Sequence, residues 1–380
     1  MHILFVTRGC RSQAYPLLGI FETDQAKALC SLGLKISYLA IDLRSIRRRR
    51  KLGYHFYNND SFDVFELSLP IGAVPIKLFT FIGRLCALFL YRKVVKKNGV
   101  PDIIHSHFAN IGTIASVLKR KYNVPLVHTE HSSEIIYNKI DSIKKRLYGK
   151  VYTDADAVIA VSPALQKALR DTFKVDALMI FNIIDFNTFT NIRNINSNNT
   201  FTFVSVGGLI YRKGFDLLIT AFAELSKDIN ANLIIVGQGP LLPSLQDLSC
   251  KLNVADKITF TGNLDRESIA EIMSNSQAFV LASRGETFGV VYAEAMAAGL
   301  PVIATKCGGP ESFVNSGNGI LAPTDNIQEL VKAMKYIYNN IGQYDSMKLR
   351  NQAYFMFSYQ SIGQKIINLY NTIISHNMTK

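Results

Sequence analysis

The chain has 380 residues, of which 48% are hydrophobic, and its formal net charge is +13. This length predicts about two to three domains, and the hydrophobic content is enough to form buried cores. The five cysteines include no pair with metal-ligand or redox spacing, so we expect reduced thiols in a cytosolic protein. No charged segment precedes the apolar residues at the start, so no signal peptide is expected.

Short apolar runs alternate with amphipathic segments along the chain, which predicts strands separated by helices. A helix is expected over residues 23–32, where Gly33 ends it, and another over 215–225. A third is expected over 290–298. The predicted strands are residues 3–7, 35–41, 102–106, 126–129, 157–161, 177–180, 201–206, 232–236, 258–260, 278–281 and 302–305.

This alternation predicts parallel sheets with helices on both faces. Residues 191–200 consist almost entirely of Asn, Ile, Arg, Ser and Thr and predict a linker. We therefore expect two doubly wound, Rossmann-like α/β domains, over residues 1–185 and 200–355. Ligands of such sheets bind beyond the carboxyl ends of the strands, so a cleft between the two domains is the expected active site.

The positive charge is concentrated in the first half, around an apolar stretch at residues 76–91 that is too short and too charged to span a bilayer. A core-packed helix beside a solvated basic loop is one interpretation. The other is docking on an anionic membrane surface, which gains roughly 1 kcal/mol per basic residue. Nucleic acid is not an expected partner, because the basic run has no interleaved aromatic residues. The basic residues are Arg44, Arg47, Arg48, Arg49, Arg50, Lys51, Lys77, Arg84, Arg92, Lys93, Lys96 and Lys97.

Two glutamates in the second half of the chain flank the start of a predicted helix. Glu286 is expected in the loop before the helix and Glu294 on its second turn, at most about 12 Å away at helical rise. The amides of Phe288, Gly289 and Val290 would point toward a negative charge between them. This spacing suits a sugar, a diphosphate and a ribose, in that order.

Residues 205–216 predict a strand, a loop and the start of a helix. Gly207 and Gly208 would allow a ligand close to the backbone. Lys213 lies at the positive end of the helix, which favours a phosphate beside it. Arg212 either shares this role or faces water.

Gly237 and Gly239 look like the start of a dinucleotide fingerprint, but Leu242 stands where the third glycine is needed. We interpret them as a tight turn between strand and helix.

Two histidines, His105 and His107, end a predicted strand and share one of its faces. His131 ends the next predicted strand. Two such ends side by side favour a site over ordinary hydrogen-bonded histidines. A zinc site of two histidines and a glutamate is a weaker alternative, because its third ligand is unassigned.

Two further segments allow both a structural and a functional interpretation. Asp154 and Asp156 have the spacing of some metal-dependent sugar transferases, but we favour a capped turn into a buried strand. Gly19 follows the first strand, where a side chain would block a sugar or phosphate. An ordinary flexible turn is the alternative.

In this order the motifs resemble a retaining glycosyltransferase of group 1, family 4, with the two-domain GT-B architecture. The resemblance covers nearly the whole chain. Its strongest element is the glutamate pair followed by Ala-Met-Ala-Ala-Gly-Leu-Pro at 295–301. The other matching segments are residues 101–107, 127–131, 160–165, 205–216, 236–240 and 258–262.

The resemblance implies roles for individual residues. Glu294 matches the glutamate that binds the donor ribose, and Glu286 matches the one beside the donor sugar that is important for catalysis. Lys213 matches the residue that neutralises the diphosphate. His107 matches a histidine that reaches the donor sugar, and Gly19 a loop near sugar and phosphate. Phe288, Gly289 and Val290 match the backbone that meets the diphosphate and the sugar.

Two positions depart from the family pattern. Gly208 stands where many relatives carry arginine, so that half of the usual Arg–Lys diphosphate clamp is either absent or supplied by Arg212. The glycine pair of the first domain is reduced to Gly19. The resemblance also implies a last helix, about 359–374 within a segment 356–380, that crosses back to the first domain.

The expected activity is transfer of a sugar from a nucleoside-diphosphate sugar to an acceptor hydroxyl with retention, without metal or cofactor. The first domain would bind the acceptor, with His131 as a candidate contact. We expect a lipid-linked or membrane-borne glycan, in cell-surface polysaccharide or glycolipid biosynthesis, and a cytoplasmic protein peripheral on the inner face of the plasma membrane. A UDP-sugar 2-epimerase and a non-catalytic nucleotide-sugar-binding scaffold are the alternatives.

Overall fold

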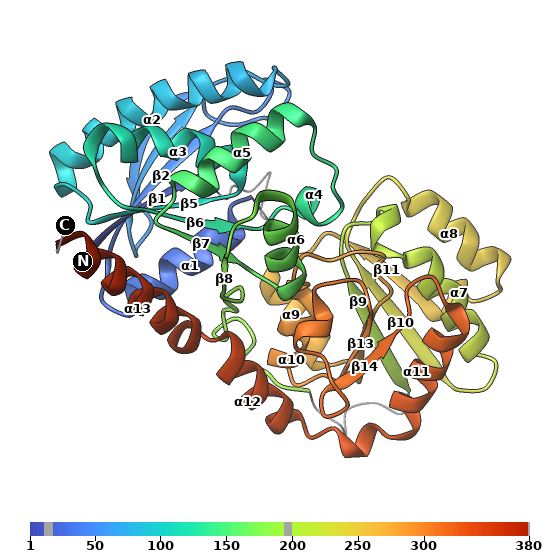
Figure 1. Cartoon of the computed structure of the whole chain (residues 1–380). Helices are drawn as coiled ribbons and strands as arrows, with labels where there is room; N and C mark the ends of the chain where they lie inside the picture. The colour runs from blue at the N-terminus through green and yellow to red at the C-terminus, as the bar shows by residue number, and fades with distance from the viewer. Residues whose placement is uncertain (11–17, 194–199, 379–380) are drawn as a thin grey trace. The chain divides into compact units, whose positions relative to one another are not determined.

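A computed structural model describes residues 1–10, 18–193 and 200–378. The chain divides into two compact units. Met1–Ile183 and Tyr359–Lys380 form the N-terminal unit, and Ile184–Ser358 forms the C-terminal unit. Each is a parallel sheet covered by helices, as the alternating pattern predicted (Figure 1).

The N-terminal unit contains an eight-stranded sheet in the order β3-β4-β2-β1-β5-β6-β7-β8. All neighbours are parallel except β3 and β4, which form an antiparallel hairpin at one edge. The sequence analysis did not predict this hairpin, because the edge strand β3 exposes most of its side chains and lacks a buried apolar run. The strands are β1 (His2–Thr7), β2 (Lys35–Asp42), β3 (Gly53–Asn58), β4 (Asp63–Ser68), β5 (Ile103–His107), β6 (Leu126–Glu130), β7 (Ala157–Ala160) and β8 (Leu178–Met179).

Helices cover both faces of this sheet (Figure 1). One apolar core joins the sheet to α1 and α13, and a second joins it to α2 and α3. In none of the described helices is the sequence both long and apolar enough to span a bilayer. The helices are α1 (Ile20–Ser31), α2 (Ile76–Asn98), α3 (Ala109–Tyr122), α4 (Ser133–Ile136), α5 (Ser142–Asp154), α6 (Pro163–Phe173) and α13 (Tyr359–Met378).

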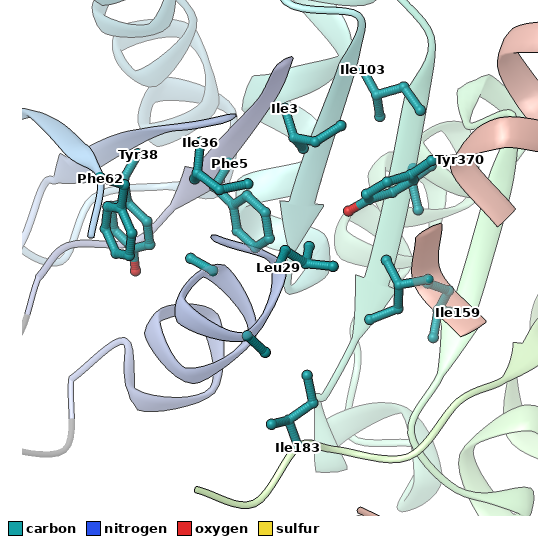
Figure 2. Close-up of a cluster of buried hydrophobic side chains, with 14 of the residues drawn as sticks. Ile3, Phe5, Leu29, Ile36, Tyr38, Phe62, Ile103, Ile159, Ile183 and Tyr370 are labelled. Atoms are coloured by element: carbon teal, nitrogen blue, oxygen red, sulfur yellow. The ribbon is translucent and has the colours of Figure 1, made fainter. Parts of the chain in front are cut away.

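The last helix, α13, packs on the N-terminal unit, which confirms the predicted crossing back. Figure 2 shows the ring of Tyr370 among side chains of the sheet, near Ile103 and Ile159. The Tyr370 hydroxyl is also hydrogen-bonded with Nδ1 of His105. A fully buried aromatic residue with its polar atom satisfied anchors the end of the chain to this core.

The C-terminal unit contains a six-stranded, wholly parallel sheet in the order β11-β10-β9-β12-β13-β14. The strands are β9 (Phe201–Val206), β10 (Ala231–Val236), β11 (Ile258–Gly262), β12 (Ala278–Leu281), β13 (Val302–Thr305) and β14 (Gly319–Ala322). Strand β14 was not predicted. The helices are α7 (Phe215–Leu225), α8 (Leu242–Lys251), α9 (Arg266–Ser274), α10 (Val290–Ala297), α11 (Ile327–Asn339) and α12 (Ser346–Phe357).

The predicted linker at 191–200 is wrong at Arg193. Arg193 is buried in the C-terminal unit, where its backbone N–H donates to Ala298 O at 2.8 Å. Its guanidinium donates to Ser346 Oγ at 2.9 Å and to Gln277 O at 3.2 Å. A buried arginine with paired N–H groups is part of the core, although in sequence it looks like a polar linker residue. Residues 194–199 lie outside the described part of the chain.

The strand order reverses direction once in each sheet. The reversal lies between β1 and β5 in the first sheet and between β9 and β12 in the second. In open parallel sheets, the loops that leave the carboxyl ends of two such strands diverge and leave a crevice for ligands. Candidate site residues are therefore those that directly follow these four strands.

Candidate active site

Lys213 and Glu286 come together at the strand-order reversal of the C-terminal sheet. Lys213 follows β9, at the end of a short 3₁₀ turn (Tyr211–Lys213), and Glu286 follows β12. Lys213 Nζ donates to Glu286 Oε1 at 2.5 Å, and Ser283 Oγ donates to the same oxygen at 2.7 Å. Both charged side chains are largely buried. The anion expected beside Lys213 is thus supplied by the protein itself, so the lysine alone does not require a bound phosphate.

Arg212 belongs to the same cluster of charges. Its Nη1 donates to Gly285 O at 2.9 Å and lies 3.9 Å from Glu286 Oε2. Arg212 thus lies beside Glu286 and is also partly exposed, and its predicted role toward a phosphate stays a prediction. Because the Arg212 side chain is partly exposed, it contributes positive potential at the solvent side of the cluster.

Glu294 is buried on the second turn of α10, as predicted from the helix start at Val290. Its Oε1 accepts from Arg266 Nη2 at 2.7 Å and from Arg266 Nε at 2.9 Å. Two hydrogen bonds from one planar guanidinium fix the orientation of the carboxylate. The sequence analysis missed Arg266, because it lies 28 residues away at the start of another helix and belongs to no motif.

The start of α10 is shaped by Gly289 and Phe288. Gly289 precedes the helix with φ 88°, and a Cβ there would lie 2.7 Å from Tyr292 Cδ2, so both backbone and space require glycine. The Phe288 ring is buried against Phe313, with ring centroids 5.2 Å apart. Val290 begins the helix, so its N–H belongs to the first turn, whose amides have no partner within the helix.

The structure describes the surroundings of two of the predicted glycine positions. The nearest atom to a Cβ at the exposed Gly208 would be Gln238 O at 3.8 Å, so no close contact within the described chain requires glycine there. Gly19 has φ 69°, and its Cβ would lie 2.8 Å from Gly9 O. Glycine at position 19 is therefore favoured by its own backbone conformation, and its predicted place near a sugar or phosphate and the alternative of an ordinary turn both stay predictions.

In the N-terminal unit, His107 and His131 lie next to each other at the ends of the paired strands β5 and β6, as predicted. His107 Nδ1 is 3.1 Å from His131 Nε2, and both side chains are buried. Burial lowers the pKa of His107 well below its usual value and that of His131 to about 3, so both rings are neutral at pH 7. Their other ring nitrogens have no hydrogen-bond partner in the described chain.

His105 and Glu130 are structural rather than open to a ligand. His105 is hydrogen-bonded with Thr129 Oγ1 at 2.7 Å and with Tyr370. The Glu130 carboxylate accepts from Tyr152 Oη at 2.7 Å and from the backbone N–H of His131 and Ser132. Burial raises the pKa of Glu130, but these hydrogen bonds and neighbouring His128 outweigh it and lower the pKa overall.

The arrangement of the acidic residues does not support a metal site. Across residues 1–10, 18–193 and 200–378, no group of three or more His, Cys, Asp or Glu could hold a metal ion. Asp156 Oδ2 accepts from the Leu126 backbone N–H at 2.8 Å and from Lys119 Nζ at 2.6 Å. This agrees with the favoured interpretation of Asp156 as a residue that positions the start of a strand.

A cavity of about 580 Å³ opens in the N-terminal unit, beside His131. Arg8, which directly follows β1, stacks over Phe108 with its guanidinium carbon 3.9 Å from the ring centroid. Its Nε lies 3.6 Å from the fully buried carboxylate of Glu22, whose pKa burial raises. Sequence analysis missed Arg8, although its position after a central strand was a usable signal. The lining residues are Arg8, Val74, Ile76, Phe79, Phe108, Ala109, Asn110, His131, Ser132, Ser133, Glu134, Asp141, Lys144 and Tyr148.

Comparison with known families identifies the class of protein that carries this fold and these residues. Residues 26–187 match the family model Glycosyltransferase Family 4, and residues 188–354 match Glycosyl transferases group 1. An uncharacterized glycosyltransferase of Methanocaldococcus jannaschii is 31% identical over 301 residues, which are 78% of this chain and 82% of that protein. The chain therefore belongs to the family 4, group 1 glycosyltransferases.

Solved structures show the same architecture. Sucrose-phosphate synthase from Thermosynechococcus elongatus has a TM-score of 0.80 at 20% identity, and the match covers 99% of both chains. HepE from Anabaena, solved in complex with UDP and glucose, has a TM-score of 0.72 at 21% identity and covers 98% of this chain and 100% of that one. These matches confirm the predicted GT-B fold of two Rossmann-like domains.

Proposed function

We propose that this glycosyltransferase moves a sugar from a nucleoside-diphosphate sugar to an acceptor hydroxyl with retention of anomeric configuration. The observation that carries the proposal is the buried Lys213–Glu286 pair at the strand-order reversal of the C-terminal sheet. A lysine and a carboxylate held together there suit a glycosyl transfer. One meets the leaving diphosphate, and the other lies beside a sugar that gains positive charge.

The leaving group is stabilised by positive groups of this chain. As the anomeric bond breaks, negative charge grows on the diphosphate, close to Lys213, Arg212 and the first amides of α10. Arg212 and the first amides of α10 are held in place before the donor arrives, so Lys213 is the group that has to exchange its partner. We assign them this role without a metal or a cofactor.

Donor binding would change the partner of Lys213. In the protein alone, Glu286 Oε1 accepts from both Lys213 and Ser283. A diphosphate competes for the lysine, and Glu286 then has an oxygen for the sugar. Glu286 can support the cationic sugar during a same-face substitution or form a covalent intermediate, and both routes give retention.

The remaining donor contacts keep their predicted roles in this proposal. Glu294, oriented by Arg266, binds the ribose hydroxyls. The backbone of Phe288, Gly289 and Val290 meets the diphosphate and sugar. His107 is assigned a contact with the sugar. Gly19 and Gly208 are assigned to the ligand surroundings, although the contacts in the structure do not require a ligand at either position.

We assign the acceptor to the cavity beside His131. Its lining combines polar groups, such as Arg8 and Asn110, with apolar side chains such as Ile76 and Phe79. This mixture suits an amphiphile with a hydroxyl-bearing headgroup and an apolar part. A lipid-linked or membrane-borne glycan fits that description, and we propose a role in cell-surface polysaccharide or glycolipid synthesis at the inner face of the plasma membrane.

A thermal-shift screen against UDP-, GDP- and ADP-sugars tests the donor site, because a ligand that binds only the folded state raises the apparent melting temperature. UDP-glucose is the first member of the panel, since the Anabaena structure holds UDP and glucose. The proposal predicts a shift with one nucleotide class and only slow hydrolysis of that donor when no acceptor is present. No shift with any donor would contradict it.

Product analysis separates the proposed activity from its alternatives. Conversion of the donor into an epimer without acceptor would identify an epimerase. Donor binding without transfer to any acceptor in a lipid extract would identify a binding scaffold. Transfer to an extract component, with the anomeric configuration kept in the NMR spectrum of the product, is the expected result.

A further inference from the structure

Helix α2 exposes a row of large apolar side chains to solvent. Leu78, Phe81, Leu85 and Phe89 are three or four residues apart and therefore lie along one side of the helix. Phe81 is 60% exposed and Leu85 is 54% exposed. The opposite side of α2 is buried against the sheet, so this row is additional to the apolar surface that folding requires.

Strand β3 extends the row of apolar side chains. Tyr54 packs edge-on against Phe89, with ring centroids 5.9 Å apart, and Phe56 lies two residues further on the same side of the strand. Both aromatic side chains are exposed. We call the surface formed by Leu78, Phe81, Leu85, Phe89, Tyr54 and Phe56 the α2–β3 face.

Lysines of α2 border this face. Lys93 Nζ lies 5.5 Å from the Phe89 ring centroid and 5.6 Å from that of Tyr54, and Lys97 Nζ lies 4.6 Å from that of Phe56. Lys77 is exposed at the start of the row. The sequence of α2 contains no acidic residue. The face therefore combines exposed apolar groups with unbalanced positive charge.

The basic run before β3 contributes less exposed positive charge than its sequence suggests. Arg50 is buried, with its Nε 3.0 Å from Asp42 Oδ2, and its other N–H groups donate to backbone carbonyls. Arg44 is paired with the same carboxylate at 2.7 Å. Arg50 and Arg44 therefore organise the loop, while Arg47, Arg48, Arg49 and Lys51 remain exposed. Only the α2–β3 face combines positive charge with the exposed apolar row described above.

We propose that the α2–β3 face docks on an anionic lipid bilayer, with α2 lying in the plane of the interface. An interfacial helix buries its apolar row at the headgroup boundary while its lysines stay near anionic headgroups. Charge complementarity favours this occupant over a second copy of the chain. A symmetric dimer through this face would bring two sets of lysines together with no acidic residue of α2 to compensate.

Docking through α2 would also bring the acceptor cavity to the lipid surface. Ile76 and Phe79 line the cavity, and Leu78 and Phe81 on the same turns belong to the docking face. An amphiphile in the bilayer could then present its headgroup to the cavity over a short path. This consequence rests on the proposed function, whereas docking itself does not.

A single-tryptophan reporter tests docking, because the chain contains no tryptophan. Phe81→Trp places the reporter in the middle of the apolar row, and Phe355→Trp is the control. Phe355 is 75% exposed on α12 of the C-terminal unit and is not part of the α2–β3 face. The emission of each variant is recorded with vesicles of phosphatidylcholine alone and of phosphatidylcholine mixed with phosphatidylglycerol, at low and high salt.

The proposal predicts a blue shift of the reporter at position 81 with anionic vesicles, a smaller one with neutral vesicles or at high salt, and none for the control at 355. No shift at position 81 with anionic vesicles would overturn the proposal. A blue shift that needs no vesicles and grows with protein concentration would also overturn it and would indicate self-association, which sedimentation velocity would detect.

Flotation with anionic vesicles measures the contribution of the charges. Replacing Lys77, Lys93 and Lys97 by Gln should weaken partitioning on the order of 100-fold, since each basic residue near such a surface contributes about a factor of five. The matched control replaces Lys332, Lys335 and Lys348 of the C-terminal unit. Equal partitioning of the two triple variants would contradict docking through this face. Melting temperatures like that of the wild type show that both variants are folded.

Discussion

The Nζ of Lys213 donates a 2.5 Å hydrogen bond to Oε1 of Glu286, which is 73 residues away in sequence. The contact connects the loops that follow β9 and β12, the two strands between which the order of the sheet reverses. Because both side chains are largely buried, each neutralises the other in the protein alone. A diphosphate that accepts the hydrogen bond of Lys213 would therefore release Glu286, beside the sugar, from its ion pair.

Replacing either member of this pair should abolish most of the activity. We expect Glu286→Gln and Lys213→Ala each to lower kcat about 100- to 1,000-fold, the range seen when one group that stabilises transition-state charge is removed. Turnover with the identified donor measures the effect, and the melting temperature shows whether the C-terminal unit stays folded. Glu329→Gln breaks an exposed ion pair with Lys332 and should leave turnover unchanged. Near wild-type turnover in both site variants would refute the site.

Arg266 should act on donor affinity through Glu294. Arg266→Ala removes both hydrogen bonds to Glu294 Oε1, so the carboxylate loses its fixed orientation toward the ribose. We expect the donor Kd to rise about tenfold in calorimetry, with kcat at saturating donor much less affected. The single variant Glu294→Gln and the double variant of Arg266→Ala with Glu294→Gln complete a double-mutant cycle. Strictly additive effects on Kd would show that Arg266 does not act through Glu294.

The buried histidines predict a loss of stability in mild acid. His131 has its pKa lowered by burial to about 3, so the folded protein keeps it neutral while the unfolded chain binds a proton below pH 6.5. Stability is therefore fully present above pH 6.5 and falls as the pH decreases toward 3, by about 2 kcal/mol between pH 7 and pH 5 from this residue. Urea unfolding at both pH values measures the change.

The variant His131→Gln isolates this contribution, because glutamine does not titrate. The difference in unfolding free energy between pH 7 and pH 5 should be smaller for the variant than for the wild type. The same pH dependence in both proteins would mean that His131 is not kept neutral in the folded state.

Tyr152 should stabilise the N-terminal unit through the buried carboxylate of Glu130. Its hydroxyl donates to Glu130 Oε2 at 2.7 Å. Tyr152→Phe leaves that buried charge with one fewer donor, which we expect to cost about 1–3 kcal/mol of unfolding free energy. Tyr148→Phe, on the same helix α5 but in the lining of the cavity, is the comparison. Equal stability of wild type and Tyr152→Phe in urea would contradict the role assigned to this contact.

Most of the fold could be predicted, because its central strands are buried on both faces and appear as continuous apolar runs. Strands β12 and β13 have the predicted bounds, and helix α7 does too. The hairpin of β3 and β4 could not be found in this way. Half-exposed strands at a sheet edge are held by their partner and by side chains of α2 rather than by an apolar run of their own.

The candidate site was predictable where its residues belong to one local segment. Glu286 and Glu294 stand on either side of the start of α10, and their placement follows from helix geometry. Arg266 was missed because it belongs to no motif and meets Glu294, 28 residues away, only in the folded chain, whereas Arg8 was missed although it directly follows a central strand. The sequence analysis expected a phosphate as the partner of Lys213. A local pattern cannot show that a carboxylate 73 residues away takes this place in the folded chain.

The sequence by itself determined the alternation of strands and helices, the two doubly wound domains and the family, because hydrophobic period and short motifs are local properties of the chain. Only the tertiary structure decided that Lys213 is paired with Glu286 and that Arg193 is buried. It also decided that α2 exposes an apolar row. These are relationships between distant residues, and burial and ion pairing depend on which groups the folded chain brings within a few ångströms of one another.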